Sequence, residues 1–360
     1  MSIASPPVTA RPRGRAAALA VALSLLLLAA CSTAKADATG VTSGSTDGVV
    51  KLVIAEPVHG VGYLPLYVGI QEGFFAEEGL DVSTVTLQGG SAHTNAVLTG
   101  DAWAFIGGPE HNAFAAARGD KAVVIKAIAN VVNRGNNYLV AAPGLTYDGN
   151  LGAFLAGKTV VTGAHGSTPN SITLYMLKKA GLEVGRDVTV IESADPSASL
   201  AIIKQGQADV AMVSEPILGR GVAEGIWGEP FYNVPQELGP YAYSTINVRQ
   251  DSIESDPKTV AAFARALVKA LAFTNKEREK TFEIATREFP TLKADVLQRT
   301  LDRSYKDELW EWSGKVTPES VATALAVVRA SGVLSDADNP VQYDAIVDMT
   351  FIDAVGKSGE

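Results

Sequence analysis

Cysteine is almost absent from this chain, which has a single one, Cys31, among its 360 residues. One thiol cannot form an intramolecular disulfide, so the fold must be stabilised without such bonds. Basic residues are also scarce, because 30 lysines and arginines stand against 39 acidic residues and give a net charge of −9 at pH 7. Nucleic acids attract clustered positive charge. We therefore expect no nucleic-acid partner.

Common catalytic signatures are missing as well. The chain contains no G-x-S-x-G nucleophile elbow and no H-E-x-x-H metal motif,. Its serines, histidines and glutamates also lack the spacing of a catalytic triad. This pattern disfavours catalysis, and we expect neither a catalytic residue nor a bound cofactor.

The first thirty residues have the pattern of an export signal, with a basic segment "ARPRGR" before the apolar run "AAALAVALSLLLLAA". That run is too short for a dedicated membrane span.

The following "LAAC", which ends at Cys31, resembles the bacterial lipobox. The resemblance implies lipidation of Cys31 and an anchor on the extracytoplasmic face of the cell membrane. An unimportant cysteine within a signal peptide is the alternative. Residues 31–48 are small and polar, which is typical of a flexible tether.

From Val49 onward, short β-branched runs alternate with helical segments, which is typical of a parallel α/β fold,. The segments "LTGDAWAFIG", from Leu98, and "KQGQADVAMV", from Lys204, share a helix end, a glycine turn and a following strand. This repetition favours two lobes of similar plan over one continuous sheet. We predict that residues 49–135 form the first part of lobe 1 and that residues 136–240 form lobe 2. Residues 241–360 are expected to supply a return strand and C-terminal helices that pack on lobe 1.

Proline and glycine mark the ends of several predicted helices, because proline suits the first turn and glycine the end. The predicted helices span residues 64–72, 92–99, 110–118, 169–180, 198–205, 217–224, 257–274 and 319–330. We assign Phe74 and Phe75 to the core.

The loops at the strand ends hold all four histidines of the chain, His59, His93, His111 and His165. Ligands of parallel sheets bind beyond the carboxyl ends of the strands. Imidazoles can both donate and accept hydrogen bonds, which suits a polar organic ligand. Glycine and serine also precede the helices at residues 92 and 169, where backbone N–H groups can reach a ligand, although ordinary capping would use the same residues.

Four segments in order resemble the solute-binding proteins of ABC importers for nitrate, sulfonates, taurine and pyrimidine precursors. They are "GYLPLYVGIQEGFFAEEGLDV", "LQGGSAHTNAVLTGDAWAFIGG", "GKTVVTGAHGSTPNSITLYMLKKAGL" and "QADVAMVSEP". The resemblance covers residues 49–335. It implies an α/β, two-lobe periplasmic-binding-protein-like fold with a helical C-terminal segment. It also implies capture of a small-molecule solute between the lobes and delivery to an ABC transporter permease, and we expect a monomer.

The resemblance, taken with the histidine-bearing loops, implies a set of ligand-binding residues. These are Glu56, His59, Tyr63, Gly90, Ser91, His93, Gly108, Glu110, His111, His165, Gly166, Ser167, Thr168 and Glu215.

The charges in these loops indicate the type of solute. The loops contain no lysine or arginine, and Arg134 is the nearest candidate cation in the sequence. Their glutamates would repel an anion, which favours a neutral or cationic nitrogen-containing solute, such as a pyrimidine, over nitrate or a sulfonate.

Two other functions stay open. One is a pyrimidine-synthesising enzyme of related fold, which would need pyridoxal and a suitably placed lysine; the export signal argues against it. The other is a metal-binding lipoprotein that uses the histidines with Glu56, Glu110 or Glu215. The spacing of these residues does not favour a metal site, so we expect no bound metal.

Overall fold

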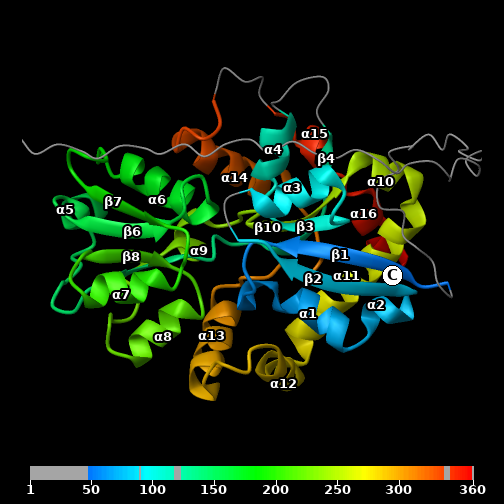
Figure 1. Cartoon of the computed structure of the whole chain (residues 1–360), viewed down its shortest axis with the longest axis horizontal. Helices are drawn as coiled ribbons and strands as arrows, with labels where there is room; N and C mark the ends of the chain where they lie inside the picture. Colours follow the sequence, from blue (N-terminus) through cyan, green and yellow to red (C-terminus); the bar gives the residue numbers. More distant parts are fainter. Residues whose placement is uncertain (1–47, 89–90, 117–122, 336–340, 359–360) are drawn as a thin grey trace, which may run out of the picture. The chain divides into compact units, whose positions relative to one another are not determined.

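The computed structural model describes residues 48–88, 91–116, 123–335 and 341–358 (Figure 1). All of these belong to one compact unit, Gly40–Glu360. The predicted signal peptide, the lipidated Cys31 and the predicted ligand residue Gly90 lie outside the described residues. No helix of the described part combines the length and apolar character that a membrane crossing requires.

The first sheet has five strands in the order β2-β1-β3-β10-β4 (Figure 1). Strand β1 pairs in parallel with β2 and β3, whereas β10 is antiparallel to both β3 and β4. We call this sheet and the helices packed on it the first lobe. The strands are β1 (Val50–Glu56), β2 (Leu80–Thr86), β3 (Ala104–Gly107), β4 (Ile125–Val132) and β10 (Ser244–Arg249).

The second sheet has five strands in the order β7-β6-β8-β5-β9, and with its helices it forms the second lobe. Strand β6 pairs in parallel with β7 and β8, and β5 is antiparallel to β8 and β9. The strands are β5 (Tyr138–Ala141), β6 (Thr159–Gly163), β7 (Thr189–Ser193), β8 (Val210–Val213) and β9 (Tyr232–Asn233). Two separate sheets confirm the predicted two-lobe α/β class; the short strands β5 and β9 were not predicted.

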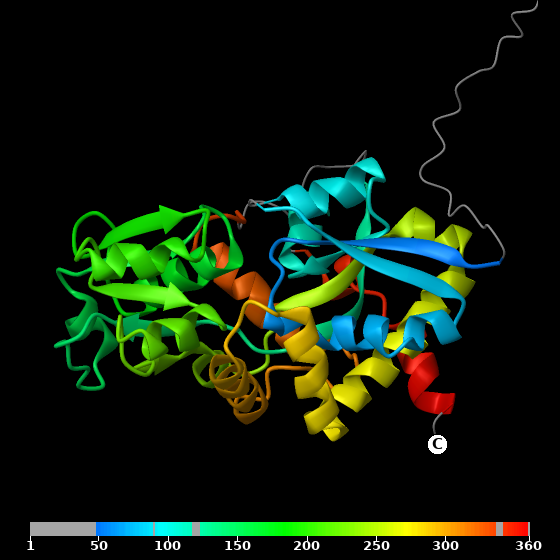
Figure 2. The same cartoon turned by 60° about the horizontal axis from the view of Figure 1, so that its bottom comes forward.

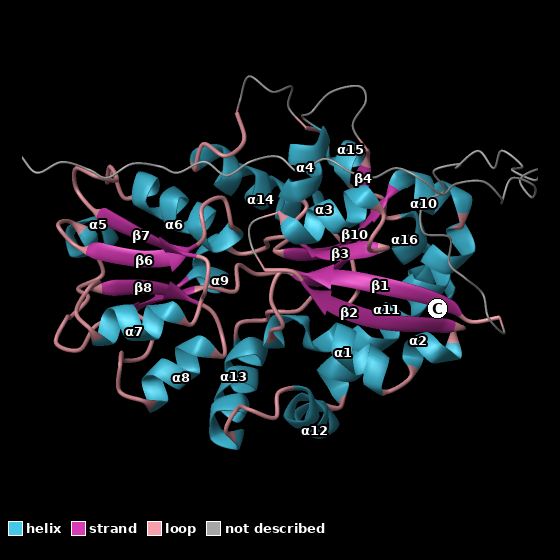
Figure 3. Ribbon diagram, viewed as in Figure 1, coloured by secondary structure: helices cyan, strands magenta, loops and turns pink. Residues whose placement is uncertain are grey.

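The helices of the second lobe cover both faces of its sheet (Figure 3). Successive residues of a strand point to opposite faces. Accordingly, Val160 of β6 packs in the cluster of Ile172 from α6, whereas the next residue, Val161, packs in the cluster of Leu200 from α7. The helices of this lobe are α5 (Leu151–Leu155), α6 (Thr168–Lys179), α7 (Ala198–Lys204), α8 (Ile217–Ala223) and α9 (Val234–Leu238).

Most remaining helices pack on the first lobe, where proline occupies the first turn of α1 and α11. Proline costs no hydrogen bond there, because the first N–H groups of a helix have no intrahelical partner. These elements are η1 (Val61–Tyr63), α1 (Leu64–Gln71), α2 (Phe74–Glu77), α3 (Ala92–Thr99), α4 (Glu110–Ala116), α10 (Gln250–Ser255), α11 (Pro257–Lys276), α12 (Arg278–Glu288), α15 (Tyr343–Ile346) and α16 (Thr350–Ser358).

The C-terminal segment packs on the first lobe, and two of its helices also contact the second lobe. Helix α13 (Ala294–Lys306) contacts α8, and α14 (Pro318–Ala330) contacts both α6 and α4 (Figure 2). The physical reason is the apolar face of α14, because Ala324 and Val327 complete the core of the second lobe while Val321 and Val328 pack with Ala113 of α4.

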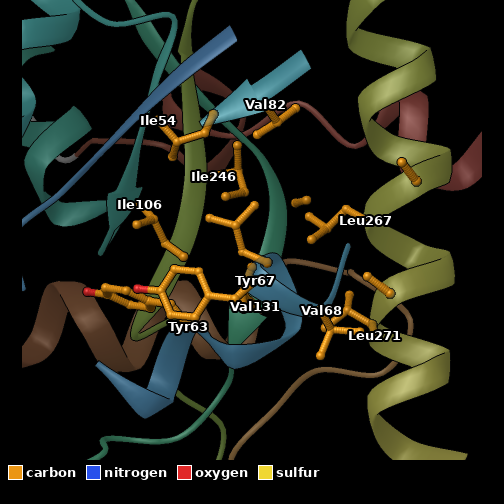
Figure 4. Packing of buried hydrophobic residues seen from close by; sticks show 14 of the residues in the cluster. Ile54, Tyr63, Tyr67, Val68, Val82, Ile106, Val131, Ile246, Leu267 and Leu271 are labelled. Atoms are coloured by element: carbon orange, nitrogen blue, oxygen red, sulfur yellow. The ribbon is translucent and has the colours of Figure 1, made fainter. Parts of the chain in front are cut away.

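The largest described core lies between the first sheet and helices α1 and α11 (Figure 4). Val68 of α1 and Leu271 of α11 lie close together in it, beneath strand residues such as Ile246. Phe74 and Phe75 are buried, as predicted, and the Phe75 ring stacks on Phe263 with centroids 4.9 Å apart.

Replacing Phe75 by alanine should lower the free energy of unfolding by about 3–5 kcal/mol, because the removed ring leaves a cavity in a packed core. The measurement is urea-induced unfolding of both proteins. Val184→Ala is the matched control: Val184 is 44% exposed, so its loss should cost less than about 0.5 kcal/mol. Equal costs for the two variants would contradict the core assignment.

Candidate ligand-binding cleft

A cavity of about 360 Å³ lies where loops from both sheets meet. The first lobe contributes the loops after β1 and β3, and the second lobe contributes those after β6, β7 and β8. Residues of the two chain crossings between the lobes, Asn136, Asn137 and Tyr243, line it as well, together with Ser244 at the start of β10. Parallel strands present their carboxyl ends at one edge of a sheet, which is where ligands bind. The volume is within the range of about 300–1,000 Å³ that is usual for small-molecule sites.

Many of the residues expected in the ligand set come together at this cavity. Its lining includes His59, Tyr63, His93, Gly108, His111, Ser167, Thr168 and Glu215. Five others, Glu56, Ser91, Glu110, His165 and Gly166, are not among the lining residues. The side chain of His165 is 79% exposed and pairs with Glu192 at 3.0 Å, whereas the other three histidines line the cavity.

Glu56 is fully buried at the end of β1 and supports the cavity wall from behind. Its carboxylate accepts hydrogen bonds from the Tyr67 hydroxyl at 2.5 Å and the Thr86 hydroxyl at 2.8 Å, and the Nδ1 of His59 lies 3.0 Å away. The hydrogen bond to Glu56 raises the pKa of His59. Glu56 therefore positions the His59 ring, which also packs against Phe289.

His93 and His111 form a buried pair on the first lobe, with ring centroids 4.8 Å apart in an edge-to-face arrangement. Burial lowers the pKa of His93 to about 3, aided by the neighbouring His111, and burial lowers the pKa of His111 to about 4. Both rings are consequently neutral at pH 7. Neither ring nitrogen of His93 has a hydrogen-bond partner.

One hydrogen bond at the cavity joins the two lobes directly. The hydroxyl of Thr168, at the start of α6, donates to Oε1 of Glu110 at the start of α4, over 2.9 Å. Burial raises the pKa of Glu110 to about 7. The second oxygen, Oε2, has no partner and packs against the backbone of Gly108, which lines the cavity.

Glu215 lines the cavity, and its carboxylate is bonded to three groups of the protein. Its carboxylate accepts bonds from Nε of Arg303 at 2.9 Å, from the Thr300 hydroxyl at 3.0 Å and from the backbone N–H of Gly219 at 3.0 Å. Arg303 lies on α13, far along the chain, so the sequence loops alone did not reveal this partner. Glu215 thus fastens α13 to the second lobe.

Several cavity residues were missed by sequence reasoning. Asn136 and Asn137 lie in the first crossing, and Asn137 Nδ2 donates to the Tyr243 hydroxyl of the second crossing at 2.8 Å. Asp195 and Ser199 follow β7. The polar segment "NRGNNY" between two apolar strands could have indicated Asn136 and Asn137, because asparagines in a buried crossing need hydrogen-bond partners,.

The letters of "GAFLAGKT", Gly152–Thr159, fit the phosphate-binding pattern G-x-x-x-x-G-K-[ST]. That loop requires a strand before it and a helix after it. Here helix α5 comes first and strand β6 follows, so the match has no structural counterpart.

Residues 61–280 match the family described as NMT1/THI5 like. The chain belongs to this family. It is also 27% identical over 260 residues to YtlA of Bacillus subtilis (strain 168), whose name ascribes it a binding role; the match covers 72% of this chain and 76% of YtlA.

Solved structures of similar fold include the alkanesulfonate-binding protein SsuA from Xanthomonas axonopodis pv. citri, bound to MOPS, with a TM-score of 0.64, 17% identity and coverage of 82% of this chain and 97% of SsuA. The periplasmic nitrate-binding protein NrtA from Synechocystis PCC 6803 has a TM-score of 0.59, 16% identity and coverage of 84% and 92%. The desulfurization enzyme DSZB shares the fold too, with a TM-score of 0.62, 13% identity and coverage of 86% and 99%. These TM-scores show a common fold.

The four histidines do not assemble into a metal site in the described part of the chain. No three His, Cys, Asp or Glu side chains among residues 48–88, 91–116, 123–335 and 341–358 are placed to hold a metal ion together.

Replacing His111 by glutamine should make the stability of the protein less sensitive to acid. The folded pKa of His111, about 4, lies below the unfolded value of about 6.5. The contribution of the neutral His111 to the free energy of unfolding is therefore complete above pH 6.5. This contribution is lost as the pH falls towards 4, by up to about 1.4 kcal/mol per pH unit.

The measurement is the free energy of unfolding in urea between pH 7 and 4.5. Glu110 titrates in this window with the opposite sign, since its folded pKa of about 7 is raised, so the readout is the difference between His111→Gln and the wild type. Identical pH slopes would contradict the burial of a neutral imidazole.

Proposed function

We propose that this protein is an extracytoplasmic solute-binding lipoprotein, which captures a small polar organic ligand between its lobes and delivers it to an ABC import permease. The observation that carries the proposal is the cavity whose walls come from strand-end loops of both sheets. Membership of the NMT1/THI5-like family supports it, as do the names of SsuA and NrtA. Lipidation of Cys31 would hold the protein at the membrane.

The cavity geometry favours a ligand-dependent closure. A ligand that touches Tyr63 on the first lobe and Ser167 on the second makes its full set of contacts only when the lobes are close together. Such a ligand shifts the population towards the closed form, because it binds that form more tightly. Only residues 133–137 and 239–243 join the two sheets along the chain.

Binding, rather than catalysis, also fits the chemistry of the lining. The fold alone does not decide, because DSZB is an enzyme with a similar fold. The described lining residues include no lysine, which a pyridoxal enzyme would need, and no cysteine. Their hydroxyl, amide and imidazole groups are instead suited to hydrogen bonding a solute.

A ligand found by thermal-shift screening of sulfonates, nitrate, pyrimidines and flavins should also compact the protein. Binding only the folded state raises the melting temperature by mass action, and closure brings the lobes together. Small-angle X-ray scattering with and without the ligand measures the radius of gyration. An unchanged radius for a saturating ligand would contradict the two-lobe capture mechanism.

Asn136→Ala should weaken binding of that ligand about tenfold or more, because the loss of one hydrogen bond to the ligand costs about 0.5–1.5 kcal/mol and a stranded partner costs more. His165→Ala is the comparison variant, because His165 does not line the cavity. Its affinity for the ligand should equal that of the wild-type protein. Isothermal titration calorimetry measures both. If His165→Ala binds more weakly and Asn136→Ala binds normally, the result would favour the ligand-binding residues expected from the sequence over those that line the cavity.

A further inference from the structure

The carboxyl group of Glu110 is buried at a point where the two lobes touch. Glu110 begins α4 of the first lobe, and only 1% of the residue is exposed. Its Oε1 accepts the hydrogen bond from the Thr168 hydroxyl of the second lobe, and its Oε2 has no partner. Within the described residues, Thr168 is therefore the one side chain that bonds to this carboxyl group. The hydrogen bonding of a buried, titratable group thus depends on the opposite lobe.

This carboxyl group lies directly behind the cavity wall. Thr168 and Gly108 line the cavity from opposite lobes. A Cβ atom placed on Gly108 would lie 1.9 Å from Glu110 Oε2, so the carboxyl group fills the space that a side chain at Gly108 would need. Moving the lobes apart would withdraw Thr168 from Glu110. Water from the cavity would then reach the carboxyl group.

No lysine, arginine or histidine in the described part of the chain forms an ion pair with Glu110. Burial raises the pKa of Glu110 to about 7, and the hydrogen bonds from its own backbone N–H and from Thr168 offset this rise only in part. The elements β4, α14 and α15 pack against α4. Their charged residues do not shift the pKa of Glu110. These residues are Lys126, Glu319, Arg329 and Asp344.

The titratable neighbours of Glu110 are neutral near pH 7. Burial raises the pKa of Tyr63, Tyr241 and Tyr243, and the charge of Glu110 adds to this rise. Burial lowers the pKa of His111, the next residue in the chain, to about 4. Among these five residues, Glu110 alone changes its charge near pH 7. The charge at this contact between the lobes is therefore set by one group.

We propose that the contact between Glu110 and Thr168 is a pH-sensitive latch, which holds the lobes together when Glu110 is protonated and weakens when Glu110 is charged. This inference rests on the proposed capture of a solute between two lobes. A neutral carboxyl group can stay buried beneath Thr168, whereas a carboxylate gains hydration when the lobes separate. Glu110 thus controls closure without touching the ligand.

The direction of the pH effect follows from the pKa of Glu110 in the two forms. With the lobes in contact this pKa is about 7, and exposure to water would return it to the ordinary value of 4.5. The closed form therefore binds the proton more tightly, so acid favours closure. This contribution is complete below pH 4.5 and is lost as the pH rises through 7. Between pH 8 and pH 5.5, the ratio of closed to open molecules should rise by up to about 30-fold.

The test is small-angle X-ray scattering of the ligand-free full chain, so it requires no known ligand. We expect the radius of gyration to be smaller at pH 5.5 than at pH 8, because more molecules are closed. Equal radii at the two pH values would overturn the latch but leave solute capture intact. A solute screen without any binder would instead count against the proposed function.

Glu110→Gln should abolish this pH response. The amide is neutral at both pH values, and its oxygen can still accept the bond from Thr168. The variant should therefore have the compact radius at pH 8 as well. A pH response as large as that of the wild type would overturn the role of Glu110.

Glu279→Gln is the matched control, because Glu279 is an exposed residue of α12 and loses the same charge. It should keep the wild-type pH response. Loss of the response in this control would show a general charge effect and would contradict the latch.

The hydrogen bond itself is tested at Thr168. Thr168→Val keeps the shape of the side chain but lacks the hydroxyl, so it should be more expanded than the wild type at pH 5.5. Thr168→Ser keeps a hydroxyl donor and should restore the wild-type radius. Circular dichroism checks that each variant is folded. A folded Thr168→Val variant that is as compact as the wild type would overturn the latch.

Discussion

Parallel strand pairing is the constraint on which the cavity depends. Because β1 pairs in parallel with β2 and β3, and β6 with β7 and β8, the loops that follow them emerge together at one edge of each sheet. The antiparallel strands β10 and β5 complete the sheets and connect to the two crossings that line the cavity. Reversing the direction of one of these strands would move the loop that follows it to the opposite edge of the sheet.

The polar groups of the cavity divide into two kinds. Glu56 and Glu215 each accept bonds from several groups of the protein, and their role is to hold neighbouring elements in place. His93 and Asn136 retain buried atoms without partners. Buried polar atoms in folded proteins are almost always bonded, so these two side chains are the more informative guides to a ligand.

The C-terminal helices give the two lobes a shared support. Arg303 of α13 bonds to Glu215 of the second lobe, and Trp310 Nε1, just beyond α13, donates to the Gly62 carbonyl of the first lobe at 2.9 Å. Helix α14 contacts both α4 and α6. Movement of the lobes would therefore have to be accommodated by these contacts as well as by the two crossings.

The sequence by itself determined the class of fold and most helices and strands, because hydrophobic periodicity and proline positions act over a few residues. It also indicated the strand-end loops, and three of their four histidines do line the cavity. Only the tertiary structure decided that His165 is exposed and does not line the cavity, that Arg303 neutralises Glu215 and that Asn136 lines the cavity. These outcomes depend on pairs far apart in the chain, 88 residues in the case of Glu215 and Arg303. Local patterns carry no information about such pairs, since packing of whole elements brings them into contact.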